Sequence, residues 1–212
     1  MKKRPMLFNA PMVRALLDGS KTQSRRVVKF PHKNPLGTWE PTSIGGPNGG
    51  RLADGGTVPE QGAIWHTRTG DCLSSPYGQP GDRLWVRETW IDASSALHSC
   101  VIYRADGDEQ ACGEPWKPSI HMPRWASRIL LEIVSVRVER LTDISESDAI
   151  AEGIEPVYGV WRDYQNQPSV NHHPAWSTAI DSYRSLWESI NGTGSWDLNP
   201  LVWVIEFKRV TA

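Results

Sequence analysis

The chain has 212 residues, of which 39% are hydrophobic and 22% charged, and its formal net charge is −1. This length suits one domain with a real core, and no apolar run approaches the ~20 residues that span a bilayer. The balanced charge excludes a strongly basic protein that coats DNA without specificity. Three scattered cysteines, Cys72, Cys100 and Cys112, are too few for a disulfide framework, so we expect a reducing, cytoplasmic setting.

The first expected element is a short helix over residues 9–19. Pro11 suits its first turn, apolar residues recur at three- and four-residue spacing, and Gly19 is a natural C-terminal stop. Residues 21–28 are polar but include residue types that strands tolerate, which predicts a turn leading into a strand.

Residues 31–80 hold 10 of the 18 glycines and 7 of the 16 prolines. This composition predicts a long irregular loop and not a second domain. Within it, residues 63–66 indicate a short strand. The glycine-rich piece 45–50 lacks the Gly-Lys-Ser/Thr ending of a phosphate-binding loop, so we interpret it as a flexible loop.

Strand patterns dominate the middle of the chain. We expect strands over residues 83–90, 101–104 and 129–140, the last with apolar residues at alternating positions. The alternation slips near Val134, which predicts a β-bulge.

The last part of the chain combines two expected helices with a final strand. Ser145 and Asp148 are spaced like a capping box, which predicts a short helix that Gly153 ends. A loop over residues 155–174 precedes an amphipathic helix over residues 176–190, and a strand follows over residues 201–208.

The order of these elements does not alternate as it does in doubly wound folds. We therefore expect an α+β fold, in which a mostly antiparallel, barrel-like sheet is flanked by a few helices. The 11 tryptophans are expected to fill the core and the walls of a cleft.

Residues 19–26 contain a lysine, hydroxyl groups and two arginines just past a helix end. Such groups could bind phosphate, and a lysine in a partly dry cleft has a lowered pKa and can accept a proton. An equally good explanation is that the charged side chains of residues 19–26 lie in a loop and are simply solvated.

In the strand over residues 83–90, alternation puts Glu88 on a face shared with apolar residues, opposite Trp85 and Arg87. An unpaired carboxylate there would be expensive, so Glu88 needs a cationic partner or a polar cavity. A structural ion pair and a role in a cleft both remain open.

Arg124 and Arg128 flank Trp125, which combines cations with an aromatic face as single-strand binders do. The alternative is that Trp125 packs against the end of the barrel. No Cys-x-x-Cys pair and no histidine pair at helical spacing indicates a metal site, and the adjacent His172 and His173 fall in an expected loop. We expect no metal and no cofactor.

Together these segments resemble the ASCH family, a branch of the PUA-like barrels, and most closely the longer members carried by bacteriophages and prophages. The resemblance implies one ASCH domain over residues 1–212, with loop insertions at about 31–80 and 155–174. It also implies a cleft that binds RNA or a nucleobase. The matching segments are residues 19–26, 80–90, 141–154 and the last strand.

Some compact members of this family are amidohydrolases that remove the acetyl group from N4-acetylcytidine, and others are described as ribonucleases. On their pattern Lys21 and Glu152 match the catalytic Lys and Glu, and Ser24 stands where the family has Thr. The resemblance thus implies catalytic roles for Lys21, Ser24 and Glu152. The implied RNA or nucleobase contacts are Thr22, Arg25, Arg26, Trp85, Arg87, Glu88, Arg124, Trp125 and Arg128.

Four functions are compatible with these features. The first is hydrolysis of a modified pyrimidine such as N4-acetylcytidine, and the second is non-catalytic reading of RNA. A ribonuclease ranks below both, because no two-histidine arrangement supports it, and a phage-encoded interaction protein is the fourth. The expected partner is RNA, another single-stranded nucleic acid or a free modified nucleoside, with no membrane, and the oligomeric state stays open.

Overall fold

The structure is a computed structural model that describes residues 1–46, 55–94, 100–107, 114–166 and 175–211. Part of the glycine-rich piece, residues 47–50, lies outside these ranges. So do Cys112, His172 and His173. Cys72 and Cys100 are free and exposed.

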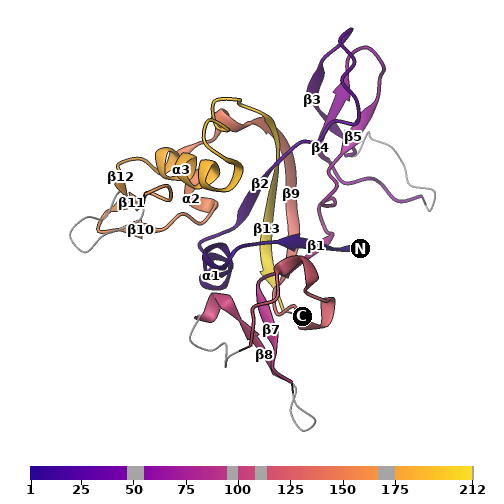
Figure 1. Ribbon diagram of the computed structural model, residues 1–212. Helices are drawn as coiled ribbons and strands as arrows, with labels where there is room; N and C mark the ends of the chain where they lie inside the picture. The colour runs from indigo at the N-terminus through magenta and orange to yellow at the C-terminus, as the bar shows by residue number, and fades with distance from the viewer. Residues whose placement is uncertain (47–54, 95–99, 108–113, 167–174, 212) are drawn as a thin grey trace.

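A five-stranded sheet forms the centre of the molecule, with the strand order β1-β6-β9-β13-β2 (Figure 1). The first pair, β1 and β6, is parallel, and the other neighbours are antiparallel. The sheet is open, so its two edge strands are β1 and β2. The bounds are β1 Lys3–Leu7, β2 Gln23–Val27, β6 Arg83–Arg87, β9 Leu130–Arg140 and β13 Leu201–Val210.

The longest strand, β9, confirms the expected bulge. Its pairing with β13 shifts between Ile133 and Ser135, which leaves Val134 without a partner on β13 and 51% exposed. The extra residue lets the apolar residues on both sides of the bulge stay on the buried face of the strand.

Within the described ranges, three α-helices border the sheet, and the cap signals of all three are satisfied. Asn9 caps α1 by accepting a hydrogen bond from the backbone N–H of Met12, and Gly19 ends it with a left-handed φ of 86°. The side chains of Ser145 and Thr178 cap α2 and α3 in the same way. The bounds are α1 Ala10–Asp18, α2 Glu146–Ala151 and α3 Ala179–Asn191.

Short 3₁₀ helices connect several elements. They are η1 Arg104–Asp106, η3 Ser119–His121, η4 Arg124–Ala126 and η5 Leu141–Asp143.

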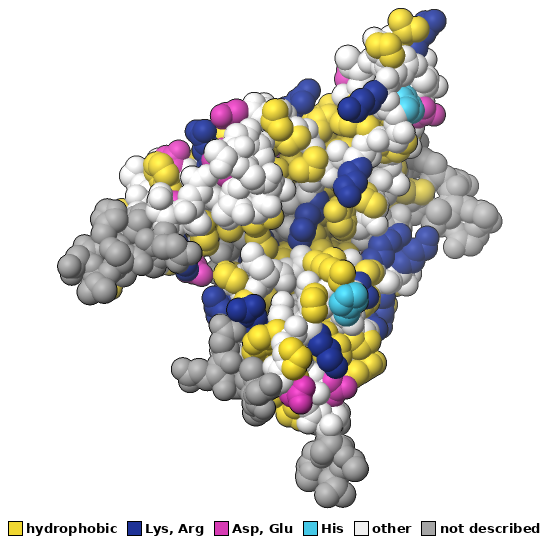
Figure 2. Space-filling view, viewed as in Figure 1, with side chains coloured by type: hydrophobic (Ala, Val, Ile, Leu, Met, Phe, Trp, Pro, Cys, Tyr) yellow, Lys and Arg dark blue, Asp and Glu magenta, His cyan; other side chains and the backbone are white. Residues whose placement is uncertain are grey.

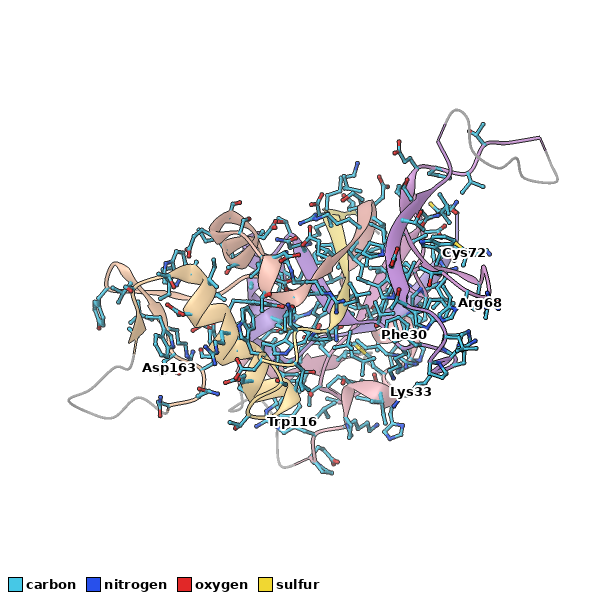
Figure 3. All side chains as sticks on the ribbon, turned by 90° about the horizontal axis from the view of Figure 1, so that it is seen from above. Phe30, Lys33, Arg68, Cys72, Trp116 and Asp163 are labelled. Carbon is cyan, nitrogen blue, oxygen red and sulfur yellow. The ribbon has the colours of Figure 1, made fainter. Side chains whose placement is uncertain are left out.

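Both expected loop insertions contain sheet structure, which corrects the prediction of irregular chain. Figure 1 shows that the sheet β3-β4-β5 projects from the body on one side, while β10-β11-β12 lies beside α3 on the other. Figure 3 shows the same separation from above, with Arg68 and Cys72 far from Asp163. The bounds are β3 Trp39–Ile44, β4 Gln61–His66, β5 Cys72–Ser74, β10 Pro156–Val157, β11 Val160–Arg162 and β12 Ala175–Trp176.

Three further expectations need correction. The strand expected over residues 83–90 is interrupted after Arg87, and β7 Trp90–Asp92 instead pairs with β8 Val101–Tyr103. Helix α3 begins at Ala179 and not at residue 176, because Trp176 belongs to β12. The described sheets are not closed into a barrel, although the mixed, mostly β architecture is α+β as expected.

Three clusters of buried hydrophobic residues form the core of the described chain. The first includes Met6, Leu84, Ile133 and Ile205, the second includes Trp187 of α3, and a small third one consists of Trp90, Met122 and Ala126. Five of the 11 tryptophans are buried, namely Trp85, Trp90, Trp187, Trp196 and Trp203, whereas Trp65, Trp125 and Trp176 are exposed. Among the described helices, none has the length and apolar character needed to cross a membrane.

Candidate functional site

Lys21 and Glu152 meet where the chain leaves α1 and where α2 ends. Their backbones form an isolated antiparallel bridge, and both residues are only 2% exposed. The Nζ of Lys21 donates to the backbone oxygen of Glu152 at 2.7 Å and to its Oε2 at 2.9 Å. The structure thus brings the expected Lys and Glu together as a buried ion pair.

Burial lowers the pKa of Lys21, because removing the ammonium group from water disfavours its charged form. The carboxylate of Glu152 opposes this effect, whereas the nearby Arg25 and Arg26 add to it. A lysine whose pKa is lowered accepts and releases protons more readily near neutral pH. This is the property that acid–base chemistry would require of Lys21.

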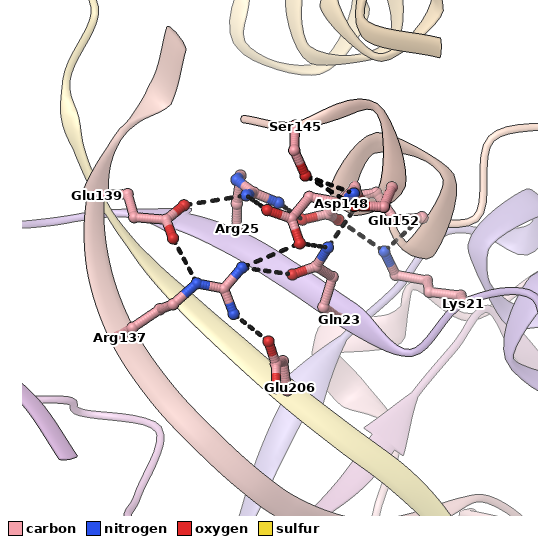
Figure 4. A network of polar contacts seen from close by, with 10 residues as sticks. Lys21, Gln23, Arg25, Arg137, Glu139, Ser145, Asp148, Glu152 and Glu206 are labelled. Carbon is pink, nitrogen blue, oxygen red and sulfur yellow. Dashed lines mark hydrogen bonds and ion pairs between the residues drawn. The ribbon is translucent and has the colours of Figure 1, made fainter. Parts of the chain in front are cut away.

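Arg25 joins this pair to a wider network (Figure 4). Its fully buried guanidinium contacts Glu152 Oε1 at 3.4 Å, and both Glu139 and Asp148 at 3.1 Å. Arg137 then links Glu139, Asp148 and Glu206, and it also contacts the side-chain oxygen of Gln23. Both terminal nitrogens of Arg25 contact carboxylates, whereas its Nε is buried without a described partner, so the charge of Arg25 is compensated inside the fold.

The pKa of Asp148 gives this network a pH dependence. Burial acts to raise this pKa, but Gln23, Arg137 and Arg25 stabilise the carboxylate and hold the pKa below its ordinary value. The stability that Asp148 contributes is therefore present above its ordinary pKa and is lost as pH falls through its lowered pKa. We expect Asp148→Asn to lower the free energy of unfolding at about pH 7 and to have little effect at about pH 2. Urea unfolding at both pH values checks this, and an equal effect at both would contradict it.

Ser24 lines the same pocket as Glu152 but is not hydrogen-bonded to the Lys21 and Glu152 pair among the described residues. In β2, Gln23 and Arg25 point toward α2, and alternation turns Ser24 to the opposite face. In the described part of the chain, its hydroxyl forms no hydrogen bond with Lys21 or Glu152. Thr22 has an exposed side chain, and its backbone joins α2 to β13.

A pocket opens beside this network, between the edge of β2 and α3. Its volume of about 80 Å³ is small compared with the roughly 300–1,000 Å³ of sites that enclose a drug-sized ligand. It can hold a small group such as an acyl substituent, but not a whole nucleoside. Its lining includes Met12, Ser24, Arg26, Glu152, Tyr183 and Trp187.

Glu88 and Arg128 form a second ion-pair cluster. Burial raises the pKa of Glu88, and Arg128 opposes the rise by donating two hydrogen bonds of 3.0 Å to its carboxylate. The same guanidinium binds Asp106 and lies 3.9 Å from the ring centre of Tyr103. The prediction that Glu88 requires a cationic partner is confirmed, and Arg128 has both of its donor edges occupied.

Several arginines form no ion pair with a described carboxylate: Arg14, Arg26, Arg68, Arg87, Arg124, Arg140 and Arg209. Contacts along one edge of the central sheet join three of them. Arg26, Arg87 and Arg124 come from β2, β6 and η4, and all three are half-buried. We call this group, together with Trp85 and Trp125, the arginine surface.

Contacts along the edge of the sheet connect the arginine surface. Arg26 donates to the backbone oxygen of Leu7 at 2.7 Å, and Leu7 pairs with Arg87 in the sheet. The guanidinium carbons of Arg87 and Arg124 lie 4.8 Å and 5.9 Å from the ring centre of Trp85. Figure 2 shows Lys and Arg side chains among hydrophobic ones across the middle of the face that contains β1, β2 and β13.

Trp125 adds an accessible aromatic ring next to Arg124. It is 61% exposed, and it meets the buried Trp90 edge to face at a centroid distance of 5.7 Å. This contact orients the ring while leaving much of it in solvent, as a stacking platform requires.

Sequence reasoning missed most members of the buried network. Arg137 and Glu139 are two residues apart in a strand and so share a face, which was an available signal of charge on an otherwise apolar strand. Their partners come from elements distant in sequence, so the pattern alone could not identify them. The missed members are Gln23, Arg137, Glu139, Asp148 and Glu206.

No family model matches the chain, and no curated protein or solved structure is significantly similar to it. Within the described ranges, no three His, Cys, Asp or Glu side chains are grouped so that they could hold a metal ion.

Proposed function

We propose that this chain binds single-stranded RNA, with the arginine surface holding phosphates and Trp125 stacking on a base. The observation that carries the proposal is the contrast between two sets of arginines. Arg25, Arg128 and Arg137 are neutralised by carboxylates, whereas Arg26, Arg87 and Arg124 have none among the described residues.

Clustered arginines without counter-charges repel one another, and a bound anion relieves that repulsion. Guanidinium groups match phosphate oxygens in geometry, and each contact releases counterions from the nucleic acid. The net charge of −1 excludes a non-specific coat, but a local patch of three arginines is compatible with it. The three arginines can therefore attract RNA phosphates locally, although the chain as a whole has no positive net charge.

The exposed ring of Trp125 favours a single strand over a duplex. A base can stack on a protein ring only when it is not stacked on adjacent bases. Such bases occur in loops, at ends and in unpaired RNA. Duplex RNA would offer the arginine surface only its phosphates.

The open sheet is compatible with membership of the PUA-like ASCH family, which we include in the proposal. Its edge strands approach each other where Arg26 of β2 donates to Leu7 of β1. In a closed barrel, the two edge strands β1 and β2 would pair through backbone hydrogen bonds. Here a side-chain hydrogen bond from Arg26 links them instead.

The test is fluorescence anisotropy with a short labelled RNA, in single-stranded and duplex form. Three phosphate contacts predict that affinity for the single strand falls about 20-fold between about 50 mM and about 200 mM salt. We expect weaker binding of the duplex. Undetectable binding of the single strand at the lower salt concentration would refute the proposal.

A second candidate function is hydrolysis of an acylated pyrimidine, and the lowered pKa of Lys21 beside Glu152 is what favours it. In its neutral form, Lys21 would accept a proton from the water that adds to the amide carbonyl and would return that proton to the amide nitrogen, so that the C–N bond breaks and acetate and cytidine leave. Water is the nucleophile in this scheme, because the hydroxyl of Ser24 forms no hydrogen bond with Lys21 or Glu152 among the described residues.

Incubation with N4-acetylcytidine followed by chromatography tests this second candidate. Cytidine formed by the unmodified protein and not by a folded Lys21→Ala variant would support it. The absence of cytidine from the unmodified protein would remove it.

A further inference from the structure

A second pocket lies at the other end of β1, away from the arginine surface. Its volume is about 350 Å³, within the roughly 300–1,000 Å³ range of small-molecule sites. It shares no lining residue with the arginine surface or with the pocket at Glu152. Its polar lining includes Lys2, Arg4, Gln61, Ser74, Gln79 and Asp82.

Gln61 is the unusual member of this lining. It is only 6% exposed, and its side-chain oxygen is buried without a hydrogen-bond partner in the part of the chain that the structure describes. A buried oxygen with an unmade hydrogen bond destabilises the fold. A glutamine oxygen that lines a pocket in this state is ready to accept a hydrogen bond from a ligand.

The backbone holds Gln61 firmly in place. It pairs with Ile44 of β3, and the next residue, Gly62, packs directly on β9. A Cβ at Gly62 would come within 2.7 Å of the Cα of Arg137. The strand therefore fixes the backbone of Gln61 beside the pocket.

The charges of the pocket favour an anion. Asp82 accepts hydrogen bonds from the Lys2 backbone at 2.6 Å and from Arg4 at 2.8 Å, so its charge is already compensated. The ammonium group of Lys2 forms no ion pair with a described carboxylate. Gly78 allows this close packing, since a Cβ there would lie 2.8 Å from the Arg4 guanidinium.

We propose that this pocket binds a nucleoside monophosphate, whose base donates an N–H to Gln61 and whose phosphate lies against Lys2 and Arg4. A glutamine amide recognises a base edge by pairing its oxygen with a donor and its N–H with an acceptor. The pocket is large enough for one nucleotide. This inference is independent of the proposed RNA binding, because the two surfaces share no residue.

Isothermal titration calorimetry with nucleoside monophosphates, the matching nucleosides and inorganic phosphate tests the proposal. At least one monophosphate should bind more tightly than its nucleoside and than phosphate alone. Gln61→Leu and Lys2→Gln should each weaken that binding about tenfold, whereas Gln165→Leu and Lys33→Gln should leave it unchanged.

Three outcomes would overturn the proposal. The first is the absence of binding by any monophosphate, and the second is binding that neither Gln61→Leu nor Lys2→Gln weakens. The third is equal affinity for inorganic phosphate and the monophosphates, because it would show an anion site that does not recognise a base. Gln61→Leu should raise the melting temperature of the free protein, since it removes a buried unpaired oxygen. If that variant fails to fold, Lys2→Gln carries the test.

Discussion

Replacing Arg25 with methionine should lower the free energy of unfolding by about 3 kcal/mol or more, since removing one partner from a buried ion pair costs about 3–5 kcal/mol. The side chain of Arg25 is fully buried and compensates Glu139, Asp148 and Glu152. We expect a loss of stability at the low end of that range. Glu139 and Asp148 are partly exposed to solvent, and Glu152 would keep its ion pair with Lys21.

The adjacent Arg26 provides a matched control. It donates one hydrogen bond to a backbone oxygen and has no described carboxylate partner, so Arg26→Met should cost only about 1 kcal/mol. Urea denaturation of both variants measures the difference. Equal losses of stability would show that the network around Arg25 contributes little to the fold.

Changing all three arginines of the arginine surface to glutamine should weaken binding of single-stranded RNA about 100-fold at about 100 mM salt. Each phosphate contact on a single strand contributes about 0.7 logarithmic units at this salt concentration, so three contacts contribute about two units. The fold should survive, because none of the three belongs to an ion pair with a described carboxylate.

A triple variant with the same change in charge serves as the control. Lys33, Arg68 and Arg184 lie outside the arginine surface, and changing them to glutamine should leave affinity nearly unchanged. If both triple variants lost affinity equally, net charge would explain the binding and the arginine surface would not.

The strands with the clearest alternation were predictable from sequence, and those rich in glycine or proline were not. The bulge at Val134 followed directly from the slip in the pattern of β9. Strand β1 was missed because Pro5 and two basic residues, Lys3 and Arg4, hide its pattern, although a proline is tolerated on an edge strand. Within residues 31–80, the strand expected over residues 63–66 lies in β4, but β3 and β5 were missed, since abundant glycine and proline usually indicate loops.

The candidate site shows a different limit. Arg25 and Arg26 are equivalent by sequence, yet strand alternation sends them to opposite faces, and only one face meets carboxylates. The pairing of Lys21 with Glu152 was implied by a family resemblance, and the contact between them is present. The orientation of Ser24 depends on which face of β2 meets α2, and the sequence does not reveal that.

The most direct test of RNA binding by the arginine surface is the slope of log affinity against log salt concentration. For the unmodified chain and a single-stranded RNA, three phosphate contacts predict a slope of about −2. The Arg26, Arg87 and Arg124 triple glutamine variant should give a slope near zero. An unchanged slope in that variant would contradict the account, because it would mean that the phosphates are held elsewhere on the molecule.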